Sequence, residues 1–276
     1  MLLSIVDGRG SDQLLRYLPA VDQEAYKSRV QPSTWDLPKF YWIFRDMDFE
    51  QWRSTNTSGV KVLWLSGPAE CQISSASSCI VDLAKETYAG AQHSVLYFFC
   101  STTPTEIPVI TTFANTIVHQ LSCSPQLKEK VVSTFLRTLV DKILGKRSRS
   151  EPETSPFKAD DSMEEVMKKA LELSSSDEYW CALRAVADIS REQGLSLIID
   201  GLDKVEQQES KFIRELDRFI EHLRERPSTT RVLLTSRPQA EIKEILDRLP
   251  CIEYDRERKG MICHVLYSGS PYKKGS

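Results

Sequence analysis

The chain has 276 residues, of which 41% are hydrophobic and 27% are charged, as in a globular protein with enough apolar residues for a substantial core. A net charge of −3 argues against a protein that coats nucleic acid or binds membranes through basic clusters. No apolar run approaches the roughly 20 residues of a membrane span, and the apolar start is too short for a signal peptide, so we expect a cytoplasmic or nuclear protein.

The N-terminal part divides into a polar segment and an aromatic one. Residues 1–32 are expected to form a peripheral lead-in with one short helix from Asp12 to Leu18. Four aromatic residues then fall within five positions, namely Phe40, Tyr41, Trp42 and Phe44. A solvated helix would not carry so many aromatic side chains, so we expect this segment to pack against the core.

Apolar runs of strand length alternate with helical patterns over the rest of the chain. Strands are predicted at 60–66, 93–101, 195–200, 231–237 and 251–255. Helices are predicted at 73–88, 107–121, 127–143, 162–173, 177–193, after Asp203 to about 226, and at 238–249. This alternation predicts a mostly parallel sheet with helices on both faces.

Two segments have little to bury. Residues 145–161 are rich in charge, Ser and Pro, and we expect a disordered surface loop there. Residues 259–276 have no periodicity and are expected to form a flexible tail.

The seven cysteines are odd in number and form no C-x-x-C pair, which indicates small core residues in a reducing compartment. The four histidines lack the spacing of metal ligands.

The first predicted strand is followed by a loop and a helix, the context of a phosphate-binding loop. In the pattern G-x-x-x-x-G-K-[ST], backbone N–H groups cradle the phosphates, the lysine reaches the outer ones and the hydroxyl holds Mg²⁺. Here Gly67 has the first position, Gln72 that of the second glycine, Ile73 that of the lysine and Ser74 that of the hydroxyl, followed by Ser75. Alone, this pattern equally fits an ordinary strand-to-helix turn.

Two later strands end in polar residues. Asp200 closes the third strand and is followed by Asp203, and a carboxylate at this end of a parallel strand can hold the water around Mg²⁺. Arg237 closes the fourth strand, where a guanidinium can reach a terminal phosphate. Each feature by itself also fits a simple turn or a surface arginine at a strand end.

In this order, the three elements resemble the NACHT-type NTPase domains of signalling proteins, in particular the nephrocystin-like N-terminal domains abundant in fungal ankyrin-repeat and NLR-like proteins. The resemblance spans about residues 33–258 and rests on five segments, Phe40–Trp52, Val62–Gly67, Phe98–Cys100, Leu197–Asp203 and Leu233–Pro238. It implies a three-layer P-loop NTPase fold with strand order 5-1-4-3-2. It leaves open whether the chain is a complete product or a fragment of a multi-domain protein.

The resemblance also implies roles for the polar residues. Asp200 matches the magnesium-associated acid of the second Walker motif, Asp203 the second acid of that motif, and Arg237 the sensor arginine. Four positions depart from the pattern, because Ile73 replaces the lysine, Gln72 replaces a glycine, Glu70 adds negative charge and Lys204 stands where a glutamate is frequent.

These departures predict weak nucleotide binding. The lost lysine contact costs about 1.5–3 kcal/mol, and a left-handed backbone at Gln72 adds about 1–2 kcal/mol. Together they weaken binding by roughly 10² to several 10³-fold. We expect Ile73 to fill the space that the lysine side chain would have used.

We therefore expect a non-catalytic or weakly nucleotide-binding module that acts as a scaffold or regulatory domain in cytosolic signalling. Its magnesium site, Ser74 and Asp200, would be vestigial, it would need no cofactor, and its partners would be other protein domains or copies of itself rather than nucleic acid. The alternative is an active signal-transduction NTPase that hydrolyses ATP or GTP with Mg²⁺, Asp200 and Arg237 and takes another cation, for which Lys61 and Lys85 are the nearest lysines. A truncated relic without function is a third possibility.

Overall fold

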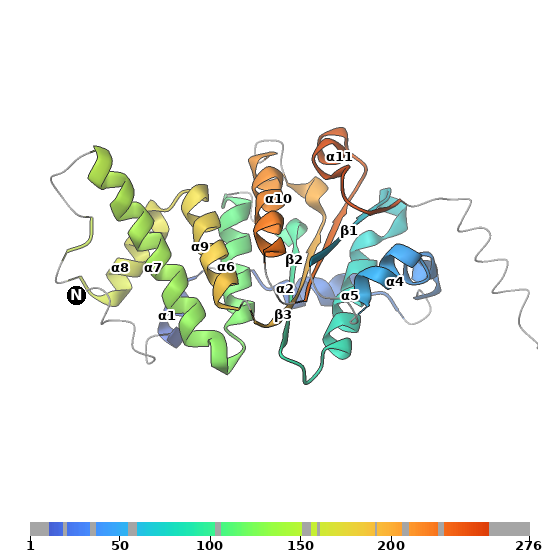
Figure 1. The fold of residues 1–276 in the computed structure, drawn as a ribbon, viewed down its shortest axis with the longest axis horizontal. Helices are drawn as coiled ribbons and strands as arrows, with labels where there is room; N and C mark the ends of the chain where they lie inside the picture. The colour runs from blue at the N-terminus through green and yellow to red at the C-terminus, as the bar shows by residue number, and fades with distance from the viewer. Residues whose placement is uncertain are drawn as a thin grey trace, which may run out of the picture.

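Figure 1 shows the fold in a computed structural model of the chain. The structure describes residues 11–18, 21–33, 37–54, 60–102, 106–150, 156–158, 161–190, 192–205, 210–225 and 229–253. The predicted tail at 259–276 and the last two residues of the predicted fifth strand lie outside these ranges.

The centre of the fold is a five-stranded parallel sheet with the order β2-β3-β4-β1-β5. Its strands are β1 (Val60–Ser66), β2 (His93–Phe99), β3 (Gly194–Asp200), β4 (Thr230–Ser236) and β5 (Cys251–Glu253). This is the predicted order read from the other edge, so the prediction is confirmed. As expected, the strands that end next to Asp200 and Arg237 are neighbours, and β4 also pairs with β1 in register, Ser236 opposite Ser66.

The helices cover both faces of the sheet (Figure 1). They are α1 (Ser11–Tyr17), α2 (Gln23–Val30), α3 (Tyr41–Phe44), α4 (Met47–Arg53), α5 (Ile73–Thr87), α6 (Val109–Leu121), α7 (Pro125–Ser150), α8 (Met163–Leu173), α9 (Ser176–Ile189), α10 (Ser210–Arg224) and α11 (Ala240–Leu246). In the described part of the chain, none of them combines the length and apolar character that a bilayer span requires.

Alternate strand residues supply two separate hydrophobic cores, as the two-residue period of a strand dictates. In β1, for example, Leu63 and Leu65 face the core under α3, α4 and α5, whereas Val62 and Trp64 face the larger core under α6, α9 and α10. Strands buried on both faces are the reason for the uninterrupted apolar runs in the sequence.

The aromatic segment packs against the sheet, as predicted. Phe40, Phe49 and Trp52 are buried in the smaller core, and the Trp52 indole Nε1 donates a hydrogen bond to the carbonyl oxygen of Val232 at 3.0 Å. The segment therefore anchors α3 and α4 to the central strands.

The described part of the N-terminal lead-in is not peripheral, contrary to expectation. In α2, the Gln23 side chain accepts a hydrogen bond from the backbone N–H of Phe99 at 2.8 Å, and buried Lys27 forms an ion pair with Asp82 of α5 at 2.5 Å. On the same edge strand, the Gln120 side chain bonds both the N–H and the carbonyl of Tyr97. These polar side chains cover the exposed backbone of β2, and a search for apolar periodicity does not detect such contacts.

The expected loop at 145–161 is also shorter than predicted. Helix α7 includes its first six positions and ends at Ser150. Phe157 is buried at 6% exposure in the larger core, and Asp161 forms an ion pair with Lys169 of α8. Residues 151–155 and 159–160 lie outside the described ranges.

The six described cysteines form no disulfide bond with one another. Cys71 and Cys100 are buried, as expected for small core residues, whereas Cys123 is exposed.

Candidate functional site

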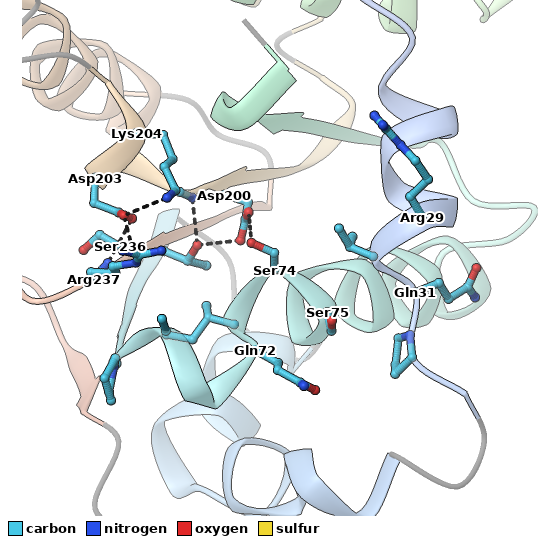
Figure 2. Close-up of a pocket in the computed structure, with 18 of the residues that line it drawn as sticks. Arg29, Gln31, Gln72, Ser74, Ser75, Asp200, Asp203, Lys204, Ser236 and Arg237 are labelled. Atoms are coloured by element: carbon cyan, nitrogen blue, oxygen red, sulfur yellow. Dashed lines mark hydrogen bonds and ion pairs between the residues drawn. The ribbon is translucent and has the colours of Figure 1, made fainter.

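A cavity of about 410 Å³ lies at the carboxyl ends of the central strands (Figure 2). The loop after β1, the start of α5, the turn after β3, the end of β4 and the segment after α2 form its walls. The residues assigned to the nucleotide site from the sequence line it, namely Gly67, Gln72, Ile73, Ser74, Ser75, Asp200, Asp203 and Arg237, whereas Glu70 does not. The topology therefore brings residues from three distant segments together, because the carboxyl ends of parallel strands share one edge of the sheet.

The loop between β1 and α5 is a compact turn. Residues Ala69–Cys71 form a 3₁₀ turn, in which the N–H of Cys71 donates to Pro68 at 3.1 Å and that of Gln72 to Ala69 at 3.2 Å. A phosphate-binding loop directs its N–H groups toward the ligand. Two of those donors are here used within the loop itself.

Gln72 has a left-handed backbone, with φ 52° and ψ 44°. It is the one non-glycine residue with positive φ in the described ranges. A glycine adopts this conformation without steric cost, whereas a residue with a Cβ atom is strained. The turn has thus kept the backbone shape of the phosphate-binding pattern at a position where the sequence has lost the glycine.

Ile73 begins α5 at the position of the lysine in that pattern. Its side chain lines the cavity and packs against the smaller core. An aliphatic side chain held in this way offers no positive charge to a phosphate.

Asp200 is fully enclosed by hydroxyl groups. Its side chain is 1% exposed, and it accepts hydrogen bonds from Ser74 at 2.6 Å, from Ser77 at 2.7 Å and from Thr235 at 2.7 Å. Burial raises the pKa of the Asp200 carboxyl, and the three hydroxyl bonds oppose that rise. Sequence reasoning missed Ser77 and Thr235, although Ser77 lies three residues after Ser74 and so shares its helix face.

Ser74 and Asp200 are the two residues predicted to hold Mg²⁺, and they contact each other directly. A Mg²⁺ ion would need the Ser74 hydroxyl and the Asp200 carboxylate at about 2.0–2.1 Å, or bound waters between them and the metal. The two side chains are instead bonded directly to each other, and both carboxylate oxygens already accept hydrogen bonds. The Ser74 oxygen keeps lone pairs beside the O–H that it donates, so these hydrogen bonds do not by themselves exclude an ion.

Asp203 holds two cationic residues at the other side of the cavity. It accepts a hydrogen bond from the backbone N–H of Arg237 at 3.0 Å, and its Oδ2 lies 3.4 Å from the Arg237 Nε and 4.0 Å from the Lys204 Nζ. Lys204 folds back over Gly201, whose φ is 78°. A Cβ atom added at Gly201 would lie 3.4 Å from the Lys204 Cγ. Figure 2 shows Asp203, Lys204 and Arg237 as one group.

Lys204 is the lysine of this cavity, and the sequence did not identify it as such. The lysines expected to lie nearest are elsewhere, since Lys61 donates to the carbonyl of Gln51 and Lys85 forms an ion pair with Glu24. A lysine directly after the second acid was visible in the sequence, but only the fold shows that it lines the cavity.

Residues at the end of α2 form the opposite wall and were also missed. Arg29 lies over the ring of Tyr26, 5.3 Å from its centroid, and Gln31 donates to Asp82 at 3.0 Å. Figure 2 shows Arg29 and Gln31 across the cavity from Asp203. No local motif marks them, because their position depends on the packing of α2 against α5.

Residues 39–237 match the protein family described as nephrocystin 3, N-terminal, which is well over half of the chain. The matched range contains the loop after β1, both acids and Arg237, and it begins after the α2 residues that complete the cavity. No curated protein matches the chain.

Proposed function

The chain belongs to the nephrocystin 3 N-terminal family, and we propose that it is a NACHT-like module that does not hydrolyse nucleotide and binds it weakly at most. It would act as a scaffold or regulatory domain in cytoplasmic signalling, with other protein domains or copies of itself as partners. The observation that carries this proposal is Ile73, an aliphatic residue packed against the core at the position where the phosphate-binding lysine is required.

The loop geometry supports weak binding independently of Ile73. Two of its N–H groups donate to loop carbonyls. A triphosphate would have to break the turn as well as bind without the lysine contact, which alone costs about 1.5–3 kcal/mol. The penalties are separate, so they add to the expected loss of affinity.

The surroundings of Asp200 support the absence of hydrolysis. Its carboxylate accepts hydrogen bonds from Ser74, Ser77 and Thr235. Lys204 stands where NACHT-type domains often have a glutamate, so a carboxylate is missing there. The same contacts compensate the burial of Asp200, because a buried carboxylate with three hydrogen bonds is satisfied by its protein partners.

The alternative function is an ATP- or GTP-hydrolysing signal-transduction protein that uses Asp200 and Arg237. One observation favours it, namely that Lys204 lines the cavity and supplies a cation. It would still require Mg²⁺ to bind beside the hydrogen-bonded pair of Ser74 and Asp200.

Calorimetric titration of the purified chain with Mg²⁺ and ATP or GTP tests the proposal. We expect no binding at micromolar nucleotide and no release of phosphate. The double variant Gln72→Gly, Ile73→Lys should bind at least about 10-fold more tightly, as one charged hydrogen bond contributes about 1.5–3 kcal/mol.

The matched control is Thr87→Lys, which adds a lysine to the exposed far end of the same helix and should leave binding unchanged. Micromolar binding by the unmodified chain that disappears in Asp200→Ala, together with phosphate release, would establish the alternative instead.

A further inference from the structure

The positive charge of the cavity lies on a different wall from the one that the phosphate-binding pattern uses. Lys204 and Arg237 follow the ends of β3 and β4, and Arg29 lies opposite them (Figure 2). The side chains of Lys204 and Arg237 are 42% and 50% exposed, so both reach solvent. The loop wall, in contrast, presents Ile73 and Gln72.

The two cations near Asp203 keep donors for a ligand. Lys204 Nζ is 4.0 Å from the Asp203 Oδ2, which is longer than a hydrogen bond, and an ammonium group has three donors. Arg237 approaches Asp203 through its backbone N–H and its Nε, so that contact does not use the two terminal nitrogens of the guanidinium. Asp203 therefore orients both groups without using all their donors.

The balance of charge around the cavity favours a ligand with a small negative charge. Its described lining contains three cationic residues, Arg29, Lys204 and Arg237, and two carboxylates, Asp200 and Asp203, a formal excess of one positive charge. A phosphate monoester carries about −1.5 to −2 at pH 7, of which this excess offsets half or more. A triphosphate carries about twice that charge or more and normally brings Mg²⁺ to neutralise it.

We propose that this cavity binds a phosphate monoester without Mg²⁺, with Lys204 and Arg237 as the phosphate-binding residues. The ligand is held, not hydrolysed, and Asp200 takes no part in contacting a metal because its hydrogen bonds to Ser74, Ser77 and Thr235 stay intact. This inference rests on the proposed function, since it assumes that magnesium triphosphate is not the ligand.

Titration of the full chain with adenosine monophosphate, ribose 5-phosphate and adenosine, each in EDTA and in Mg²⁺, tests it. We expect both phosphates to bind with the same Kd in EDTA and in Mg²⁺, and adenosine not to bind. Equal affinity for the two phosphate esters would show that the protein recognises the phosphate group. Tighter binding of adenosine monophosphate would show that the protein contacts the base as well as the phosphate.

Variants assign the residues. Lys204→Ala and Arg237→Ala should each weaken binding by about 10- to 100-fold, the loss of one charged hydrogen bond, and Lys204→Arg should retain most of it. Lys211→Ala is the matched control, because Lys211 is an exposed lysine of α10 paired with Asp177 and does not line the cavity. Lys204 and Arg237 are half exposed, so melting temperatures should stay unchanged and a loss of binding would not reflect unfolding.

Absence of phosphate binding at millimolar concentration in EDTA would overturn this inference and leave the proposed function intact. Binding that Lys204→Ala and Arg237→Ala leave unchanged would also overturn it. Magnesium-dependent binding of ATP that exceeds binding of the monophosphate would refute both.

Discussion

Replacement of Gln72 by glycine should stabilise the protein. Gln72 is exposed, makes no side-chain capping bond, and has φ 52°, so the substitution removes backbone strain without removing a cap. The strain of a left-handed residue with a Cβ atom is about 1–2 kcal/mol. A chain with glycine at this position has more conformational freedom when unfolded, so its folding is less favourable by about 0.4–1 kcal/mol. From the middle of the two ranges, the net gain is about 0.8 kcal/mol.

Urea unfolding followed by circular dichroism measures this gain, and a thermal scan should show the midpoint rising by about 1–4 °C. Glu86→Gly is the control in the same helix, because Glu86 is exposed and helical, and glycine should cost about 1 kcal/mol there. Gly90→Ala is the reciprocal control. Gly90 has φ 78° and an open space for a Cβ atom, so alanine should destabilise through backbone strain alone.

A loss of stability in Gln72→Gly similar to that in Glu86→Gly would refute the reasoning. It would mean that the left-handed backbone of residue 72 does not strain the folded protein.

Three further predictions concern the sheet. Gly194→Ala should destabilise the protein by about 1–3 kcal/mol, because the new Cβ would lie 2.1 Å from the Nδ1 of His93; in a His93→Ala background most of this cost should vanish in urea unfolding. Burial, with a smaller effect of the Arg231 charge, lowers the pKa of His93 to about 4. The unfolded chain therefore binds a proton more readily between pH 6.5 and 4, and the free energy of unfolding should fall by about 1–3 kcal/mol as the pH is lowered through that window. Unfolding curves at pH 7 and 4.5 should show a smaller decrease for His93→Phe than for the unmodified chain. An equal decrease would contradict the assignment to His93. Trp52→Phe should cost about 1–3 kcal/mol, because it leaves the carbonyl of Val232 without its indole donor, and an unchanged melting temperature would show that this bond does not matter.

The sequence predicted some residues of the candidate site and missed others. Four residues of the site were identified because they lie at or soon after the end of a strand that an apolar run marks clearly, namely Gly67, Ser74, Asp200 and Arg237. The parallel arrangement brings such strand ends together. Lys204 was noticed only as a departure from a pattern. Its place in the cavity depends on the left-handed turn at Gly201.

The sequence by itself determined the five strands, their helical connections and the loss of the phosphate-binding lysine at Ile73. These features are local, since a strand or helix is encoded by the spacing of apolar residues and a missing charge is visible at its own position. Only the tertiary structure decided that α2 covers the edge of β2, that Ser77 and Thr235 enclose Asp200, and that Arg29 and Lys204 face one cavity. Such polar contacts join residues far apart in the chain, and their partners are set by the way the helices pack around the sheet.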